Sequence, residues 1–342
     1  MTPREAFAVQ AKNCAALGSP FMGRLMQLCS DRLERGTPVT NRVLNWPGDP
    51  RPSADNVSLR LAGALHALVL RGDPLATLYP PNEVDDDRLW RGILNAIETH
   101  EAEILGFLDD APQTNEVRRS AGLLAAVAWL RPRHPLILSE VGASGGLNLN
   151  FDRYAVETPG GPLGAADPVL TLHPDWTGPT PANHPVSVSD RRGADLSPFR
   201  MTDPAEVLRL RAYLWPDQPE RHKLTEAAIA AGPPPVDKAD AADWLENRLA
   251  PRPGHHHVLF NTVAWQYFPP DVDARARAHV EAAGAQATED TPLSWIAIET
   301  DGGRGAGIAV RHWPGNQSFA LGRMDFHGRW LSWDPPSNHL YE

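Results

Sequence analysis

The first 130 residues carry apolar side chains three or four positions apart, the spacing that places them on one face of a helix. Two such segments are separated by Gly18, Ser19 and Pro20, and their apolar positions are Phe7, Val9, Ala11, Cys14 and Leu17, then Phe21, Leu25, Leu28 and Leu33. The same spacing predicts further helices over 58–70, 88–108 and 114–130. The pattern therefore predicts an N-terminal α-helical domain or lid over residues 1–130.

From residue 131 onward, short apolar runs of strand length alternate with helical patterns. Five such runs are followed by a predicted hairpin, whose strands cover 308–313 and 318–330 and whose turn contains Pro314, Gly315 and Asn316. Strands that alternate with helices are typical of an α/β domain, which we predict over 131–342. A segment rich in Pro and Gly, 155–185, is long for a loop in a compact domain and indicates an insertion.

One strand-to-helix transition, LILSEVGASGGLNLNFDRY over 136–154, carries candidate chemistry. An apolar run leads to Glu140, then to a turn of small residues over 142–146, and LNLNF begins a predicted helix. Glycines allow positive φ and let a ligand approach the backbone. A helix N-terminus presents unpaired N–H groups. The stretch therefore suits a ligand with hydroxyl or amine donors and a carboxylate or phosphate, although an ordinary α/β turn is the alternative.

A dinucleotide-binding turn requires glycine at its first, third and sixth positions. Counted from Gly142, those positions hold Gly142, Ser144 and Leu147. A nicotinamide or flavin oxidoreductase is therefore disfavoured by this turn.

Composition and charge exclude some classes of function and location. The 342 residues are 42% hydrophobic with a formal net charge of −10, so a non-specific grip on nucleic acid is not expected. The start of the chain is charged and amphipathic and no long uncharged apolar run follows, so we expect no membrane segment and a cytoplasmic protein. Cys14 and Cys29 are expected to be buried thiols. The adjacent histidines 255–257 would point to alternate faces of a strand, so no metal site is predicted.

The turn after residue 138 resembles the first motif of class I S-adenosylmethionine-dependent methyltransferases. Its residues Glu140, Gly142, Ser144 and Gly146 are spaced acid-x-Gly-x-small-x-Gly, with Ser144 at the place of the middle glycine. The resemblance implies a class I methyltransferase-like Rossmann fold, a mostly parallel sheet that ends in an antiparallel hairpin. The implied cofactor contacts are Glu140, Gly142, Ala143, Ser144 and Gly146 for the amino-acid end, Asp195 for the ribose, and Asp240 with Ala241 for the adenine. Asp190 is the alternative to Asp195, because the 155–185 insertion lengthens the usual spacing.

The same resemblance indicates where the methyl acceptor would lie. The end of the fourth strand holds candidate catalytic residues Asn261, Trp265, Gln266 and Tyr267, although a packing role for Trp265 and Tyr267 is an equal alternative. Charged side chains after the first two strands are candidate anchors for an anionic acceptor, with ordinary salt bridges as the alternative; they are Asp152, Arg153, Arg191 and Arg192.

Nearly the whole chain is similar to an uncharacterised bacterial family, domain of unknown function 2332. The similarity is carried by the runs SEVGASGGLNLNFDRY, SDRRGADLSPF, RLRAYLWPDQPER, ADAADWL and LFNTVAWQYFPP. We therefore expect an S-adenosylmethionine-dependent methyltransferase that acts on a small-molecule acceptor. The alternatives are a non-catalytic Rossmann-like binding protein and a nicotinamide or flavin oxidoreductase.

Overall fold

The computed structural model describes residues 1–232 and 234–337 and divides the chain into two compact units. Unit 1 comprises residues 1–114 and 202–223, and unit 2 comprises 115–201 and 224–342. The sequence placed the boundary at 130, but 115–130 belongs to unit 2, because every residue of the helix Ser120–Leu130 is buried there. The return of 202–223 to unit 1 was not predicted.

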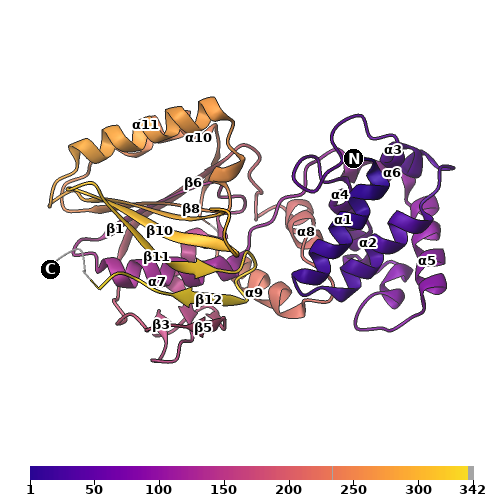
Figure 1. Ribbon diagram of the computed structural model, residues 1–342, viewed down its shortest axis with the longest axis horizontal. Helices are drawn as coiled ribbons and strands as arrows, with labels where there is room; N and C mark the ends of the chain where they lie inside the picture. The colour runs from indigo at the N-terminus through magenta and orange to yellow at the C-terminus, as the bar shows by residue number, and fades with distance from the viewer. Residues whose placement is uncertain (233, 338–342) are drawn as a thin grey trace. The chain divides into compact units, whose positions relative to one another are not determined.

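Unit 1 is helical, as the spacing of its apolar residues predicted. Its elements (Figure 1) are α1 (Pro3–Ala16), α2 (Pro20–Arg32), α3 (Pro38–Leu44), α4 (Val57–Leu70), η1 (Pro74–Leu78), α5 (Asp86–Thr99), α6 (Glu101–Leu108) and α8 (Pro204–Ala212). Thr2 and Thr37 form capping boxes at the starts of α1 and α3, where their side chains satisfy backbone N–H groups. Helix α9 (Pro219–Ala230) begins in unit 1 and ends in unit 2.

The returning segment completes the core of unit 1. Trp215 is buried in the cluster that also contains Leu61 and the free thiols of Cys14 and Cys29, which are buried as predicted. Asp217 accepts hydrogen bonds from the Ser19 hydroxyl and the Phe21 backbone N–H at the start of α2. These contacts join the two stretches of chain that make up the unit.

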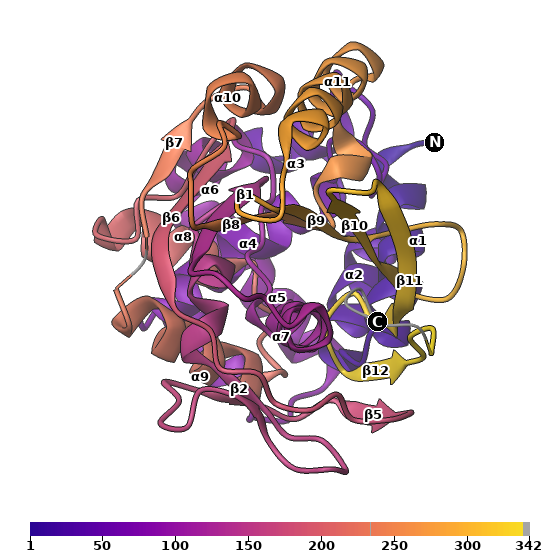
Figure 2. The same cartoon turned by 90° about the vertical axis from the view of Figure 1, so that its left-hand side faces the viewer.

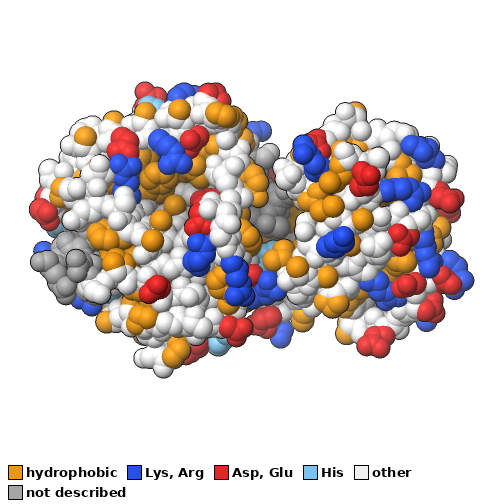
Figure 3. Space-filling view, viewed as in Figure 1, with side chains coloured by type: hydrophobic (Ala, Val, Ile, Leu, Met, Phe, Trp, Pro, Cys, Tyr) orange, Lys and Arg blue, Asp and Glu red, His pale blue; other side chains and the backbone are white. Residues whose placement is uncertain are grey.

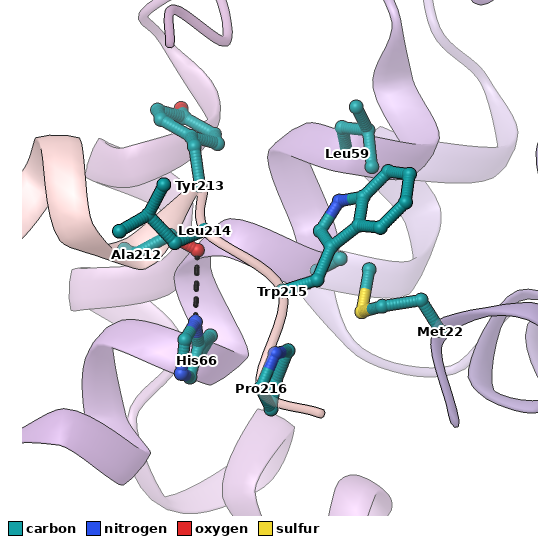
Figure 4. Close-up of a pocket in the computed structure, with 9 residues that line it drawn as sticks. Met22, Leu59, His66, Ala212, Tyr213, Leu214, Trp215 and Pro216 are labelled. Carbon is teal, nitrogen blue, oxygen red and sulfur yellow. Dashed lines mark hydrogen bonds between the residues drawn. The ribbon is translucent and has the colours of Figure 1, made fainter. Parts of the chain in front are cut away.

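A small pocket in unit 1 lies between α2, α4 and residues 212–216 (Figure 4). His66 lines it, and its Nδ1 lies 3.0 Å from the Ala212 carbonyl oxygen. Burial lowers the pKa of His66 to about 4, so the ring is neutral at pH 7. The space is sufficient for about one water molecule. The pocket is therefore part of the packing of unit 1.

Unit 2 is an α/β unit with a mostly parallel sheet. Its first elements are η2 (Val117–Arg119), α7 (Ser120–Leu130), β1 (Leu136–Val141), η3 (Leu147–Arg153), β2 (Ala155–Val156), β3 (Leu163–Gly164), β4 (Thr171–Leu172), β5 (Asp175–Thr177) and β6 (Val188–Asp195). The later ones are β7 (Val236–Lys238), α10 (Ala241–Arg248), β8 (His256–Thr262), η4 (Trp265–Tyr267), α11 (Pro270–Gln286), β9 (Leu293–Glu299), β10 (Ala306–Trp313), β11 (Gln317–Met324) and β12 (Trp330–Trp333).

The described residues form a nine-stranded sheet in the order β5-β12-β11-β10-β9-β8-β1-β6-β7. The five strands β7, β6, β1, β8 and β9 are parallel, and their chain order reverses direction at β1. This is the order of doubly wound α/β sheets. The predicted C-terminal hairpin is confirmed as the antiparallel pair β10 and β11.

Helices cover both faces of this sheet. Figure 2 shows α10 and α11 on one face and α7 on the other. Close approach is allowed by glycines, since a Cβ on Gly284 of α11 would lie 2.4 Å from the Trp313 ring and one on Gly122 of α7 would lie 2.8 Å from Ile298. Side chains alternate along each strand. The strands β9 and β10 therefore have one set of residues under α7 and another on the face of α10 and α11.

The connection after β1 differs from the prediction of an ordinary helix. LNLNF folds into the short 3₁₀-helix η3, and the 155–185 insertion follows as short strands. Three of them form the sheet β3-β2-β4, while β5 pairs with β12. Arg191 on β6 donates hydrogen bonds to the Leu149 carbonyl at 3.0 Å and the Asn150 side chain at 2.9 Å. Polar contacts to β6 thus hold η3 in place.

Adjacent histidines on β8 point to opposite faces, as their sequence positions predicted. His257 Nε2 lies 2.8 Å from the Ser139 hydroxyl on the face of α10, whereas His256 Nε2 lies 2.8 Å from the Ser294 hydroxyl on the face of α7. Among residues 1–232 and 234–337, His, Cys, Asp and Glu side chains form no group of three or more suited to a metal ion.

Two further features bear on partners. In the part of the chain that the structure describes, no helix combines the length and apolarity needed to cross a lipid bilayer. Acidic and basic side chains are interspersed over the visible face of each unit (Figure 3).

Candidate functional site

The candidate site lies in unit 2, where β1, β6 and β8 reach their carboxyl ends. In doubly wound sheets ligands bind at this edge, next to the strand where the chain order reverses. Here that strand is β1, which has β6 on one side and β8 on the other. Glu140 is the penultimate residue of β1 and is only 1% exposed. It is the acid that the sequence analysis placed at the centre of the site.

The Glu140 carboxyl group has one hydrogen-bond partner, and one of its two oxygens has none among the described residues. The Asn148 side chain of η3 hydrogen-bonds to it, and Arg119 lies near enough to exert a favourable charge interaction. Its Oε2 is buried and has no hydrogen-bond partner among the described residues. Burial raises the pKa of Glu140 well above its usual value, and the negative charge of Asp195 raises it further.

The polar groups near Glu140 are held by hydrogen bonds to other parts of unit 2. Arg119 donates from Nε to the Phe326 carbonyl at 2.9 Å and from Nη1 to the Thr262 carbonyl at 2.8 Å. The Ser120 hydroxyl donates to Asn148 Oδ1 at 2.9 Å, which fixes the amide beside Glu140. The sequence analysis missed three of these residues, Arg119, Asn148 and Thr262. Nothing in the local sequence marks any of the three, and only the fold brings them together.

The turn over residues 142–146 has the positive φ values that its glycines predicted. Gly142 has φ +69°, Ser144 +53° and Gly146 +73°. A Cβ on Gly142 would lie 2.3 Å from the Ala264 Cβ, and one on Gly146 would lie 2.9 Å from Val236. The glycines therefore let the turn pack tightly against the segment that follows β8 and against the start of β7. Ala143 is buried in this turn.

Ser144 and Asp195 join the turn to β6. The Ser144 backbone N–H donates to Asp195 Oδ2 at 2.9 Å, and the Ser197 N–H donates to Oδ1 at 2.8 Å. The buried Ser144 hydroxyl has no partner within the described residues. Asp190 lies earlier on β6 and pairs with Arg248 at 2.7 Å. Of the two alternative acids, the structure thus brings Asp195 to the glycine turn.

Asp240 lies at the end of the neighbouring strand and caps α10. Its Oδ1 accepts from the Ala242 N–H at 2.9 Å and the Asp243 N–H at 3.2 Å. The preceding residue, Ala239, donates its N–H to the Asp195 carbonyl at 3.0 Å, so the ends of β6 and β7 lie side by side. Ala241 is the buried first residue of α10. The structure therefore gives Asp240 a role in the helix and places its backbone beside that of Asp195.

The candidate residues after β8 divide into a buried and an exposed pair. Asn261 and Trp265 are buried, whereas Gln266 and Tyr267 are exposed. Asn261 follows Phe260, the register partner of Glu140, and therefore faces α10 and α11 instead of the Glu140 side of the sheet.

Glu299, a residue missed by the sequence analysis, holds the segment after β8. Its Oε1 accepts from the Asn261 amide at 2.7 Å and from the backbone N–H groups of Ala264 at 2.8 Å and Trp265 at 3.0 Å. Trp265 also packs against Trp295 with ring centroids 4.6 Å apart. Packing is thus the role that the structure gives Trp265. Within the segment Val263 has φ +56°, which is unusual for a β-branched residue.

Three of the four candidate anchors for an anionic acceptor are held in salt bridges. Arg191 forms a bidentate pair with Asp152, at 2.7 and 3.0 Å. Arg192 forms another with Asp237, both contacts measuring 2.7 Å. Arg153 donates to the Ala231 carbonyl at 2.6 Å. The ordinary salt-bridge interpretation accordingly accounts for Asp152, Arg191 and Arg192.

Comparison with known proteins identifies one family. The family model described as "Uncharacterized protein conserved in bacteria (DUF2332)" matches residues 4–333. No curated protein and no solved structure matches the chain. The match covers residues of both units and includes the candidate site.

Proposed function

We propose a function from the premise that the chain belongs to DUF2332, an uncharacterised bacterial family. In this proposal unit 2 has a class I methyltransferase-like Rossmann fold, binds S-adenosylmethionine and transfers its methyl group to a small-molecule acceptor. One observation carries it. Two buried polar atoms, Glu140 Oε2 and Ser144 Oγ, have no partner among the described residues at the strand edge where such sheets bind ligands.

The donor and acceptor groups of the site fit the proposed cofactor. A carboxylate can accept about four hydrogen bonds. Asp240 accepts two from backbone N–H groups, which leaves it capacity for an exocyclic amine, and the Asp195 carboxylate is a group of the kind that accepts from ribose hydroxyls. Glu140, Asp195 and Asp240 also stand at or just beyond the ends of three adjacent parallel strands. This order supports contacts to the amino-acid end, the ribose and the adenine in turn.

In this proposal the protein's main contribution to the reaction is to position the cofactor and the acceptor. The bound cofactor would supply an electrophilic methyl group, and an acceptor held in line with it would react without covalent help from the protein. Gln266 and Tyr267 are exposed on the segment after β8 and are our candidates for contacts with the acceptor. Tyr267 is 66% exposed, so its ring is available for such a contact.

Calorimetric titration with S-adenosylmethionine and S-adenosylhomocysteine tests the proposal. We expect both to bind the wild-type protein, and Asp195→Asn to weaken binding about tenfold or more, as expected for one lost hydrogen bond to a charged group. Asp190→Asn is the matched control, because it alters an acid of the same strand that pairs with Arg248. Absence of binding to the wild type would refute the proposal, and unchanged binding in Asp240→Asn would refute the adenine assignment.

The same samples separate the two alternative functions. Cofactor binding without methyl transfer to any member of a small-molecule acceptor panel would favour a non-catalytic binding protein. A rise in melting temperature on addition of NAD, without a response to S-adenosylmethionine, would favour an oxidoreductase.

A further inference from the structure

Glu140 is a carboxyl group in surroundings that do not compensate a full negative charge. It is 1% exposed, and one of its oxygens has no hydrogen-bond donor among the described residues. An ionised carboxylate without water or donors is costly to bury, so such groups usually take up a proton.

The charged and titratable groups around Glu140 come from three directions. Asp195 of β6 adds negative charge, and Tyr154, after η3, has its pKa raised chiefly by burial, so it stays neutral. Arg119 of η2 contributes a favourable positive charge, and its Nε and Nη1 donate to backbone carbonyls. Asn148 supplies a single neutral amide contact. Around Glu140 the negative charge of Asp195 thus opposes ionisation, and the positive charge of Arg119 offsets only part of the cost of burial.

We propose that Glu140 carries a proton while the site is empty and releases it to solvent when a positively charged ligand binds. The ligand's identity rests on the proposed function. No bond of the ligand changes in this step, because the O–H bond of the carboxylic acid breaks and the proton passes to the buffer. The ligand's positive charge then compensates the Glu140 carboxylate.

The two ligands of the calorimetric experiment share the amino-acid group, whose ammonium and carboxylate charges cancel, and differ in net charge. S-adenosylmethionine has a sulfonium cation, and S-adenosylhomocysteine has a neutral thioether in its place. Proton release should therefore accompany the first ligand more than the second. Site selectivity for the charged cofactor over the neutral product would follow from the same group, and it would weaken as the pH falls.

Titrations in buffers of different ionisation enthalpy count the protons released. We expect close to one proton per S-adenosylmethionine bound and clearly fewer for S-adenosylhomocysteine. The dissociation constant for S-adenosylmethionine should rise up to tenfold for each pH unit below the pKa of Glu140, because one proton must leave for each ligand bound. Equal proton release for the two ligands, or none, would overturn the inference while leaving cofactor binding intact.

Glu140→Gln isolates the proton, because glutamine has the shape of the protonated acid and cannot ionise. In this variant we expect no ligand-linked proton release, retained binding of S-adenosylhomocysteine and a reduced preference for S-adenosylmethionine. Glu281→Gln is the matched control, since Glu281 is a surface acid of α11 that pairs with Arg311. It should release protons as the wild type does.

A measurement without ligand tests the first half of the inference directly. The infrared C=O stretch of a protonated carboxyl should appear in the wild type at pH 7, be absent from Glu140→Gln and remain in Glu281→Gln. Absence of that band in the wild type would overturn the inference whatever the ligands do. If the band is present but neither ligand binds, the proposed function and the ligand-linked release both fail.

Discussion

At the residue scale, burial sets the protonation of a histidine pair inside unit 2. The Ser294 hydroxyl lies 2.8 Å from His256 Nε2 and 2.9 Å from His312 Nδ1, so one hydroxyl links the two rings. Burial lowers the pKa of His256 to about 3 and that of His312 to about 4. Both rings are therefore neutral at pH 7, and the folded protein resists their protonation.

This arrangement predicts acid sensitivity in a defined pH range. The unfolded chain protonates these histidines near pH 6.5, and the folded chain only near pH 3–4, so the stabilisation is present above pH 6.5 and is lost as the pH falls below it. Each histidine should remove about 1.4 kcal/mol of unfolding free energy per pH unit in that range. Urea unfolding measured between pH 7.5 and 5 checks this expectation.

The double variant His256→Gln with His312→Gln should show a shallower dependence on pH than the wild type. His255→Gln is the control, because His255 is only partly buried and lies outside the pair. If the double variant and the wild type had equal slopes, these two histidines would not be the source of the acid sensitivity.

Single residues of the site were predictable only where local sequence reveals their position. Glu140 and Asp195 could be found because each follows a strand-like run, and Gly142 and Gly146 because they punctuate a turn. Arg119, Asn148, Thr262 and Glu299 could not be found, since their role depends on which strands become neighbours. That Asn261 and Glu140 lie on opposite faces could not be predicted, because a sequence pattern gives the period of a strand but not its register to the next strand.

At the element scale, the 142–146 turn is fixed by packing as well as by backbone conformation. Its two positive-φ glycines lie against other segments, and Ser144 between them binds Asp195 through its backbone. Backbone conformation and side-chain packing therefore both hold the turn in place. Glycine substitutions can measure the two effects separately.

Gly142→Ala should destabilise unit 2 by about 2–4 kcal/mol. About 1–2 kcal/mol would come from placing alanine at φ +69°, and the rest from the contact of the new Cβ with Ala264. Gly302→Ala is the matched control, since Gly302 has φ +85° and a Cβ added there would have no atom within 4 Å, so this variant should show only the conformational cost. Urea unfolding of both variants gives the difference, and equal losses would mean that the contact with Ala264 is unimportant.

Elements with strong periodicity were predicted well and the connection after β1 was not. The strands at 136–141 and 293–299 and the hairpin of β10 and β11 follow from apolar runs and turn residues. The segment after Gly146 was predicted to begin a helix, yet Asn148 and Asn150 use their side chains in buried tertiary contacts and the chain forms only η3. Tertiary hydrogen bonds thus outweighed local propensity there.

At the scale of the whole molecule, unit 1 is built from two stretches of chain separated by 87 residues of unit 2, residues 115–201. Asp217 links the later stretch to the start of α2 through Ser19 and Phe21. Its carboxylate also stands at a helix N-terminus, where negative charge is favourable.

Asp217→Asn should lower the unfolding free energy of unit 1 by about 1–3 kcal/mol through the weakened bonds to α2. Differential scanning calorimetry should show the transition of unit 1 moving down by about 4 °C for each kcal/mol, with the transition of unit 2 unchanged. Asp31→Asn, an exposed acid near the other end of α2, is the control and should change little. Equal shifts of both transitions would mean that Asp217 does not stabilise unit 1 alone.

The overall organisation was predictable in class but not in connectivity. Helical spacing up to residue 130 and strand-helix alternation after it indicated a helical part and an α/β part. The assignment of 202–223 could not be predicted, because α8 has the same local pattern whichever core receives it. Trp215 and Asp217 determine that choice only through partners some 150 to 200 positions earlier in the chain.

The interrupted course of unit 1 has a consequence for synthesis on the ribosome. Nascent domains generally fold in order from the N-terminus as they emerge. Here the first 114 residues lack Trp215 and the clamp on α2 until almost two thirds of the polypeptide has been translated. The N-terminal helices must therefore stay incomplete while the first strands of the later sheet appear, which makes them a natural client for chaperones during that interval.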